Sequence, residues 1–235
     1  MITAAVLLIG DELLSGRTQD VNLNYIACKL VERGIVLQEC RIVPDTEDMI
    51  IEAVRALSAR NDYVFTTGGI GSTHDDITQA SIANAFNKPL VVNPEALKIL
   101  EDYYGDNIND ARRRMSLAPE GAVLHEKMVF QTENVFVMAG IPTVMQGMFD
   151  VVLPTLRSAP PILSVTVKAY VLENDLADEL SAIHAPEGVT IGSYPFDEAV
   201  NIKGTNLVAR SRDAKKLAVV KNQLQALVDS KIDTC

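Results

Sequence analysis

The sequence is poor in cysteine. Cys28, Cys40 and Cys235 are the only three in 235 residues, and they have none of the short paired spacings of zinc or redox sites. Cys28 falls in a helical pattern and Cys40 in a strand pattern, so we expect small, reduced, hydrophobic side chains. This cysteine usage fits a reducing cytoplasm.

Basic residues are outnumbered by acidic ones. Lys and Arg number 21 against 31 Asp and Glu, which gives a formal net charge of −10. Because affinity for nucleic acid and anionic lipid comes mainly from Lys and Arg, we expect neither as a partner. An anionic ligand would therefore need local help from backbone N–H groups, a metal ion or a few placed cations.

Long hydrophobic runs are also absent. The apolar segment Ala4–Ile9 has no basic residue ahead of it and is followed by Asp11 and Glu12, so it does not resemble a signal peptide. The longest uncharged stretch, Val135–Phe149, contains a glycine and a proline and is too short to span a bilayer. We therefore expect a cytoplasmic protein with no membrane partner. The length of 235 residues predicts one full domain plus a smaller unit.

Apolar runs alternate with amphipathic stretches over residues 1–157. The expected strands are Ala4–Ile9, Ile35–Val43, Tyr63–Thr67 and Val135–Met138, and the expected helices are Asn22–Arg33, Ile77–Phe86 and the segments that begin at Thr46, Pro94 and Pro142. Such alternation predicts a doubly wound α/β domain, whose ligands bind at the carboxyl ends of the strands.

Ser158–Pro161 is the best candidate for a linker. Residues 162–235 then show a β-α-β-β-α order that predicts a small α+β domain. Its expected elements are Leu163–Leu172, Asp175–Ile183, Val189–Tyr194, Asn206–Arg210 and Ala214–Val228.

The strongest local signal is the segment Gly68–Thr78, which follows a strand and precedes a helix. Its three glycines allow close backbone approach, its N–H groups would face an anion above the helix start, and Ser72 and Thr73 add hydroxyl donors. The spacing is neither that of a Rossmann fingerprint nor that of a P-loop. The alternative is a tight turn in which Asp75 or Asp76 caps the helix, but this combination of residues favours ligand binding.

Acidic residues follow two other strands. Asp11 lies in the loop Gly10–Arg17 after the first strand, and Asp45 follows the second. Because parallel strands end at one edge of the sheet, Asp11, Asp45 and Asp76 would converge on one crevice, a geometry suited to Mg²⁺ shared with a pyrophosphate. Each carboxylate alone also fits a helix cap, and Asp45 is the most ambiguous of the three.

These motifs resemble a known family. The segments that carry the resemblance are Ile9–Gly16 (IGDELLSG), Asp20–Asn22 (DVN), Val43–Thr46 (VPDT) and Thr66–Thr78 (TTGGIGSTHDDIT). They are similar to the molybdopterin-binding domain of MoaB/Mog-type proteins and of the N-terminal part of CinA. The order in Gly10–Leu14 with Asn22, and the pair Asp75–Asp76, resemble the CinA branch more closely. The segment after the linker is similar to the small domain that follows in CinA.

The resemblance implies a three-layer, MoaB/Mog-like α/β domain with a mostly parallel sheet over 1–157, a small α+β domain over 162–235, and a homo-oligomer, dimer or trimer. It implies a pterin (molybdopterin) or nucleotide ligand bound by Asp11, Ser15, Asn22, Gly68, Gly69, Gly71, Ser72 and Thr73. Asp76 and Asp45 would be the catalytic carboxylates and would hold Mg²⁺ or another divalent cation.

Three activities are compatible with this resemblance. CinA-type domains are associated with metal-dependent hydrolysis of ADP-ribose or FAD pyrophosphates, and Mog-type proteins adenylylate molybdopterin. The third alternative is a binding module that keeps the phosphate loop without the chemistry. A purely structural role would leave Gly68–Asp76 without a purpose.

The sequence departs from the CinA pattern in two places. No glycine occurs in Val123–Ala139, where CinA has a second Gly-rich loop, and Ala139 replaces a proline. That wall of the pocket must therefore differ. We also expect no deamidase domain of the kind that completes full-length CinA. Arg112–Arg114 is the one basic cluster, expected as a solvated helix face, with the alternative that one arginine reaches a ligand phosphate.

Overall fold

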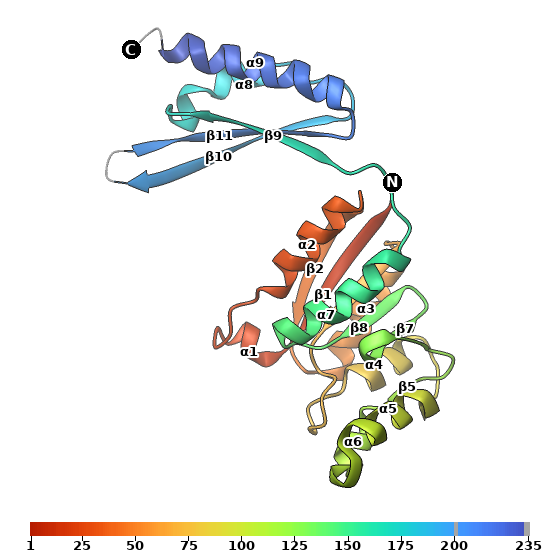
Figure 1. Cartoon of the computed structure of the whole chain (residues 1–235). Coiled ribbons are helices and arrows are strands. Elements are labelled where there is room, and N and C mark those ends of the chain that lie inside the picture. The colour runs from red at the N-terminus through yellow and green to blue at the C-terminus, as the bar shows by residue number, and fades with distance from the viewer. Residues whose placement is uncertain (200–201, 233–235) are drawn as a thin grey trace. The chain divides into compact units, whose positions relative to one another are not determined.

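A computed structural model describes residues 1–199 and 202–232; Cys235 lies outside the described residues. The chain divides into two compact units, Met1–Ala159 and Pro160–Cys235 (Figure 1). The division falls within the Ser158–Pro161 segment.

The first unit is built on a six-stranded sheet with the order β2-β1-β3-β8-β7-β6. The first four strands in this order are parallel, and β7 and β6 are antiparallel additions at one edge. The strands are β1 (Thr3–Ile9), β2 (Val36–Val43), β3 (Tyr63–Thr67), β6 (Val123–His125), β7 (Val129–Thr132) and β8 (Val135–Met138). The predicted mostly parallel sheet is confirmed.

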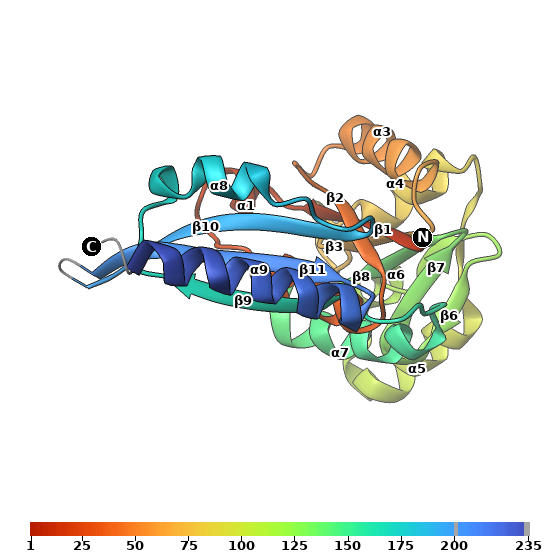
Figure 2. The same ribbon diagram turned by 90° about the horizontal axis from the view of Figure 1, so that it is seen from above.

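Helices cover both faces of this sheet. They are α1 (Asp11–Leu14), α2 (Asn22–Glu32), α3 (Glu47–Ser58), α4 (Thr78–Ala85), α5 (Pro94–Tyr104), α6 (Asp110–Arg114) and α7 (Pro142–Val152), with short 3-10 turns η1 (Gly105–Asn107), η2 (Glu126–Met128) and η3 (Leu153–Thr155). Figure 2 shows α3 and α4 on one side of the sheet and α7 on the other. The helix starts expected near Thr46, Pro94 and Pro142 are confirmed to within a residue.

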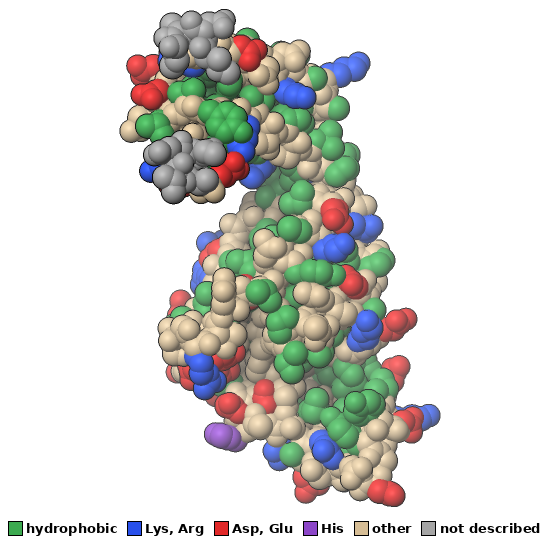
Figure 3. All heavy atoms as spheres, turned by 60° about the vertical axis from the view of Figure 1, so that its left-hand side comes forward, with side chains coloured by type: hydrophobic (Ala, Val, Ile, Leu, Met, Phe, Trp, Pro, Cys, Tyr) green, Lys and Arg blue, Asp and Glu red, His purple; other side chains and the backbone are tan. Residues whose placement is uncertain are grey.

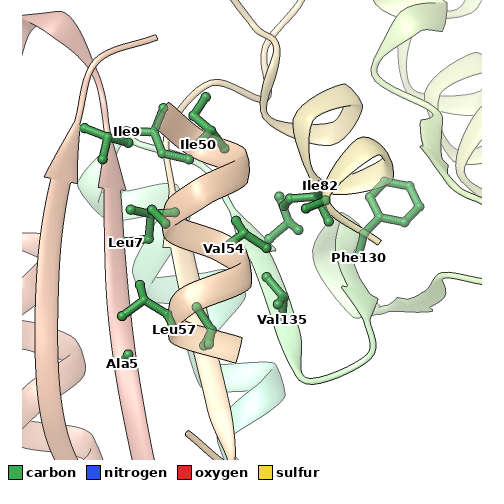
Figure 4. Close-up of a cluster of buried hydrophobic side chains, with 14 of the residues drawn as sticks. Ala5, Leu7, Ile9, Ile50, Val54, Leu57, Ile82, Phe130 and Val135 are labelled. Atoms are coloured by element: carbon green, nitrogen blue, oxygen red, sulfur yellow. The ribbon is translucent and has the colours of Figure 1, made fainter. Parts of the chain in front are cut away.

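Strand β1 explains the three layers. Its residues alternate between two cores, because successive side chains of a strand point to opposite faces. Ala5, Leu7 and Ile9 pack with α3 and α4, as Figure 4 shows, whereas Ala4, Val6 and Leu8 pack with α2 and α7. An uninterrupted apolar run is therefore the correct sequence for this central strand.

Four short strands of the first unit were not predicted. They are β6 and β7, together with β4 (Leu90–Val92) and β5 (Leu117–Pro119), which form a separate two-stranded antiparallel sheet. Segments of three or four residues are too short to show the alternation by which strands are recognised.

The second unit is a three-stranded antiparallel sheet with helices, as the sequence predicts. The order is β10-β11-β9, formed by β9 (Leu163–Ala169), β10 (Val189–Ala199) and β11 (Ile202–Ser211), with η4 (Glu173–Asp175), α8 (Ala177–Ala182) and α9 (Ala214–Ile232). The hairpin strands are longer than expected. The strand expected over Val189–Tyr194 continues through Pro195, because β10 is an edge strand, where a missing N–H is tolerated.

The surface agrees with an ordinary globular protein. Acidic and basic side chains lie beside one another on the face shown in Figure 3. Cys28 and Cys40 are free thiols on the surface. Within the described ranges, the structure contains no helix that is both long enough and apolar enough to cross a membrane.

Candidate functional site

The largest hollow of the first unit lies where its parallel strands end. Loops that follow β1, β2, β3 and β8 contribute to a cleft of about 830 Å³, joined by η2 and the end of α5. Gly10, Asp45, Gly68 and Gly140 line it, one from each of the four loops. This is the position at which open α/β sheets bind ligands.

The loop after β3 can adopt its path only with glycine. Gly68 has φ +101°, and a Cβ on it would lie 2.1 Å from the carbonyl oxygen of Ile9. Gly69 has φ +63°, and its Cβ would lie 2.3 Å from Oγ1 of Thr78. Both glycine carbonyls are fixed by Thr78, whose hydroxyl donates to Gly68 O (2.9 Å) and whose N–H donates to Gly69 O (3.0 Å).

The same loop presents unused donors. The N–H groups of Gly69, Ile70, Gly71 and Ser72 make no hydrogen bond to any part of the chain that the structure describes. Successive N–H groups without a partner supply partial positive charge and donors, which phosphate-binding loops use. Gly69 and Gly71 line both the cleft and a smaller adjoining pocket of about 150 Å³.

Asp76 closes this loop on itself. One of its carboxylate oxygens accepts hydrogen bonds from Thr73 N (2.7 Å) and Thr73 Oγ1 (2.6 Å). The carboxylate packs over Gly71, where a Cβ would lie 2.6 Å from Oδ2. The alternative that Asp75 or Asp76 caps α4 is wrong, since the N-cap is Ile77 and no side chain caps it. Asp76 instead lies in the walls of both pockets.

Asp45 approaches the glycine loop from the β2–α3 connection. Its Oδ2 accepts a hydrogen bond from the Asp11 N–H (3.0 Å), and its Oδ1 lies 3.5 Å from the Cβ position of Gly69. Burial raises the pKa of the Asp45 carboxyl, the Asp11 N–H opposes this, and the charges of Asp11, Glu12 and Asp75 raise the pKa further. Asp45 thus lies among other carboxylates, and a bound cation would reduce the repulsion between their negative charges.

We expect Asp45→Asn to stabilise the cation-free protein at neutral pH. A raised pKa means that the folded state binds more protons than the unfolded state, so stability falls as pH rises from the ordinary carboxyl value of about 3.9 through the raised one. In EDTA at pH 7, the variant should melt above the parent, and the gain should shrink as pH falls towards that ordinary value.

Glu52→Gln, on an exposed turn of α3, is the matched control. Melting temperatures measured at several pH values check the prediction. A variant that melts below the parent at pH 7 would show that the Asp45 charge stabilises the fold.

Five predicted ligand residues are not in the wall of the large cleft, namely Asp11, Ser15, Asn22, Ser72 and Thr73. Asp11 contributes its N–H to Asp45, while Ser15 donates its hydroxyl to Glu12 O (3.3 Å). The carbonyl of Ser72 accepts from Arg114 Nη2 (3.2 Å). Asn22 is only 5% exposed, donates to Gly140 O (2.8 Å) and lines a small pocket of about 50 Å³ together with Gly140. Its Oδ1 is buried and has no hydrogen-bond partner in the described structure.

The remaining predicted residues surround the loop. Gly68, Gly69 and Gly71 line the cleft, and Thr73 lines the smaller pocket. Arg114, a member of the basic cluster, lines that pocket too, and the alternative that an arginine reaches a ligand phosphate stays a prediction.

Other lining residues were missed by the sequence reasoning. Tyr103 and Tyr104 come from the end of α5, and Lys127 comes from η2. No local signal marked them, because α5 and η2 reach this edge of the sheet only in the folded chain. The prediction that this wall differs from that of CinA, made from the absence of glycine in Val123–Ala139, stays a prediction.

The carboxylates beside the glycine loop suit a cation that a ligand phosphate also binds better than a cation held by protein side chains alone. Among residues 1–199 and 202–232, no group of three or more His, Cys, Asp or Glu side chains is arranged to hold a metal ion. Mg²⁺, however, commonly binds through one or two carboxylates plus substrate phosphates and water. Asp45 and Asp76 line the same cleft as Gly69, Ile70 and Gly71, whose N–H groups are free, and fit that mode.

Comparisons with known proteins agree with this geometry. A family model described as "Probable molybdopterin binding domain" matches residues 5–158, and one described as "FAD synthase, middle domain" matches residues 161–233. A protein of Archaeoglobus fulgidus is 33% identical over 232 residues, which cover 96% of this chain and 98% of the relative.

CinA proteins are also similar. A CinA-like protein of Gemmatimonas aurantiaca is 30% identical over 89% of this chain, but this chain matches only 54% of that relative's length. The crystal structure of CinA from Thermoplasma acidophilum, whose function is given as unknown, has a TM-score of 0.62 and 25% identity, and covers 65% of this chain and 96% of its own. The chain, with its glycine loop and three-layer fold, therefore belongs to the family of probable molybdopterin-binding domains, and CinA-like proteins are among its relatives.

Proposed function

We propose that the cleft binds a nucleotide or pterin that carries a pyrophosphate, and that it hydrolyses this pyrophosphate with a divalent cation. The observation that carries the proposal is the run of four unpaired N–H groups from Gly69 to Ser72 beside the carboxylates of Asp45 and Asp76. Donors for phosphate and ligands for a cation at one edge are what pyrophosphate chemistry requires. The cleft volume lies in the range of small-molecule sites.

Each group of the chain has a definite part in this reaction. The N–H groups of the glycine loop would hold phosphate oxygens and stabilise the charge that grows on them. Asp45 and Asp76 would hold the cation, which when bound polarises the phosphate and lowers the pKa of water. Water would add to one phosphorus atom, the P–O–P bond would break, and two phosphate monoesters would leave.

The relatives indicate which compounds to try. One matching family is the FAD synthase middle domain, and CinA-like proteins match most of the chain, so FAD and ADP-ribose are the first probes. The full chain should convert ADP-ribose to AMP and ribose 5-phosphate, or FAD to AMP and FMN, with Mg²⁺, Mn²⁺ or Co²⁺ and not with EDTA. Absence of product with every metal would contradict the proposed hydrolysis.

Binding without hydrolysis is the second candidate. The observation that favours it is the absence of glycine from Val123–Ala139, which contains β6, η2 and β7 and departs in this from the CinA pattern. In that case calorimetry would record binding of ADP-ribose or FAD in the presence of Mg²⁺ with no product formed. Adenylylation of molybdopterin, by contrast, would require ATP and a pterin together and would release pyrophosphate.

An aromatic side chain at the cleft fits a planar ring in the ligand. Tyr103 is 79% exposed, and its ring meets Tyr104 edge-on with centroids 4.9 Å apart. The guanidinium of Arg112 lies 4.4 Å from the centroid of the Tyr104 ring. Tyr103 is therefore an exposed ring held by its neighbours, which is the form of a stacking platform.

We expect Tyr103→Leu to weaken binding of ADP-ribose or FAD about tenfold, since loss of one base–aromatic stack commonly costs that much. Tyr103→Phe should bind like the parent, because the ring remains. The melting temperature should hardly change in either variant, as the ring is mostly exposed. Isothermal calorimetry checks this, with Tyr170→Leu in the second unit as the control. Equal affinities of the Leu variant and the parent would remove Tyr103 from the site.

A further inference from the structure

Lys127 is the one cationic side chain in the wall of the large cleft. The described residues that line it include Glu12, Asp45, Asp75 and Asp76, and Lys127 is their only Lys, Arg or His. A ligand phosphate that enters this cleft therefore meets several carboxylates and a single ammonium group. Its neutralisation depends on the loop N–H groups, on a shared cation and on Lys127.

The Lys127 ammonium group has no polar partner among the residues that the structure describes. Within the described structure, no carboxylate lies within ion-pair distance of it and no hydrogen bond ends on it. This contrasts with Lys88, whose Nζ lies 3.2 Å from Glu133. The acidic cleft thus leaves its one ammonium group available to a ligand.

The backbone around Lys127 is held in an uncommon conformation. Lys127 and Met128 have φ values of +54° and +63°, in the left-handed region that side chains other than glycine, Asn and Asp rarely adopt. Met128 packs against the core cluster that contains Phe130. Packing of the partly buried Met128 side chain against this cluster therefore favours a turn that places Lys127 at the cleft, and such local strain is typical of functional positions.

Helix α7 makes room for the lysine. A Cβ on Gly147 would lie 2.9 Å from Nζ of Lys127 and 3.6 Å from its Cδ, so the lysine side chain runs over a position where α7 has no side chain. Gly147 lies inside the helix, where glycine is otherwise unfavourable. The helix and the η2 turn together set the position of the ammonium group.

We propose that Lys127 binds the phosphate of the ligand in the large cleft and so supplies the cation that this acidic site otherwise lacks. This inference rests on the proposed function, because it assumes a phosphorylated ligand. The inference also gives a role to the segment of β6, η2 and β7, which lacks the glycines of the CinA pattern. This segment would place one positive charge at the cleft.

Inorganic pyrophosphate is the probe for this inference. Calorimetry of the full chain with pyrophosphate and Mg²⁺ should give binding that Lys127→Met weakens about tenfold, as expected for loss of one charge-assisted hydrogen bond. Lys127→Arg should retain most of the affinity. Lys98→Met, at an exposed position of α5 outside the cleft, should bind like the parent.

A second variant tests the position of the charge. Gly147→Ala adds a Cβ at the place of the ammonium group, so we expect about a threefold loss of pyrophosphate affinity together with a higher melting temperature, because alanine favours the helix. A folded Lys127→Met protein that binds pyrophosphate as the parent does, or a parent that binds none, would overturn the inference.

Failure of the inference and failure of the proposed function give different results. Pyrophosphate binding that depends on Lys127, without hydrolysis of ADP-ribose or FAD, would keep the lysine and reject the hydrolysis. Hydrolysis with the same kcat and KM in the parent and in Lys127→Met would keep the hydrolysis and reject the lysine.

Discussion

Replacement of Asp76 by Asn is expected to lower the metal-dependent hydrolysis of ADP-ribose or FAD about 100-fold in kcat/KM, the usual size of the loss when a charge-stabilising group is removed from a reaction centre. The side chain keeps its shape, and the Asn oxygen can still accept from Thr73 N, which is 2.7 Å from the present carboxylate. The glycine loop should therefore persist while the negative charge for the cation is lost.

The measurement is steady-state hydrolysis over a range of Mg²⁺ concentrations. Because the variant loses a ligand for the cation, it should need more Mg²⁺ to reach its lower maximum. Asp110→Asn, whose exposed side chain belongs to α6, is the control. Full activity of Asp76→Asn at low Mg²⁺ would show that Asp76 serves only to shape the loop.

Gly68→Ala is expected to cost stability rather than activity alone. A Cβ at this position would lie 2.1 Å from the Ile9 carbonyl oxygen, and φ is +101°, so strand β1 or the loop must move. Steric overlap with backbone in a packed region, together with the strained φ, should lower the free energy of unfolding by about 3 kcal/mol. A loss of that size corresponds to roughly 10 °C in melting temperature.

Gly16→Ala is a matched control because it separates the cost of the positive φ from the cost of the contact with backbone. Gly16 also has a positive φ, +72°, but no atom lies within 4 Å of its Cβ position. It should cost only about 1 kcal/mol, the penalty of a left-handed backbone for alanine. Melting curves of both variants check this, and equal losses would mean that contact with Ile9 is unimportant.

Much of the first unit was predictable because its signals are local. The apolar run of β1 predicts a strand buried on both faces, and Pro94 and Pro142 each open a helix. The glycines between β3 and α4 predict a loop that passes close to other backbone, and Ile9 provides that contact. These features depend on residues within one turn or one strand, which is the range over which a sequence pattern carries information.

Some predicted site residues make contacts within the chain that no local pattern contains, and their role in ligand binding stays a prediction. Asn22 follows the first loop and resembles a ligand residue, but the packing of α2 against α7 buries it beneath Gly140. Ser15 and Asp11 lie in the right loop, yet the short helix α1 directs Ser15 to Glu12 and gives Asp45 the backbone N–H of Asp11.

The sequence by itself determined the order of strands and helices, the acidic balance, and the glycine loop with Asp45 and Asp76 at the ends of parallel strands. Those properties follow from side-chain periodicity and from the conformational freedom of glycine. Only the tertiary structure decided that Tyr103 and Lys127 join the same cleft. Helix α5 and the η2 turn are far from Gly68 along the chain, and they reach it because the packing of buried Leu100 and of partly buried Met128 places their neighbours there.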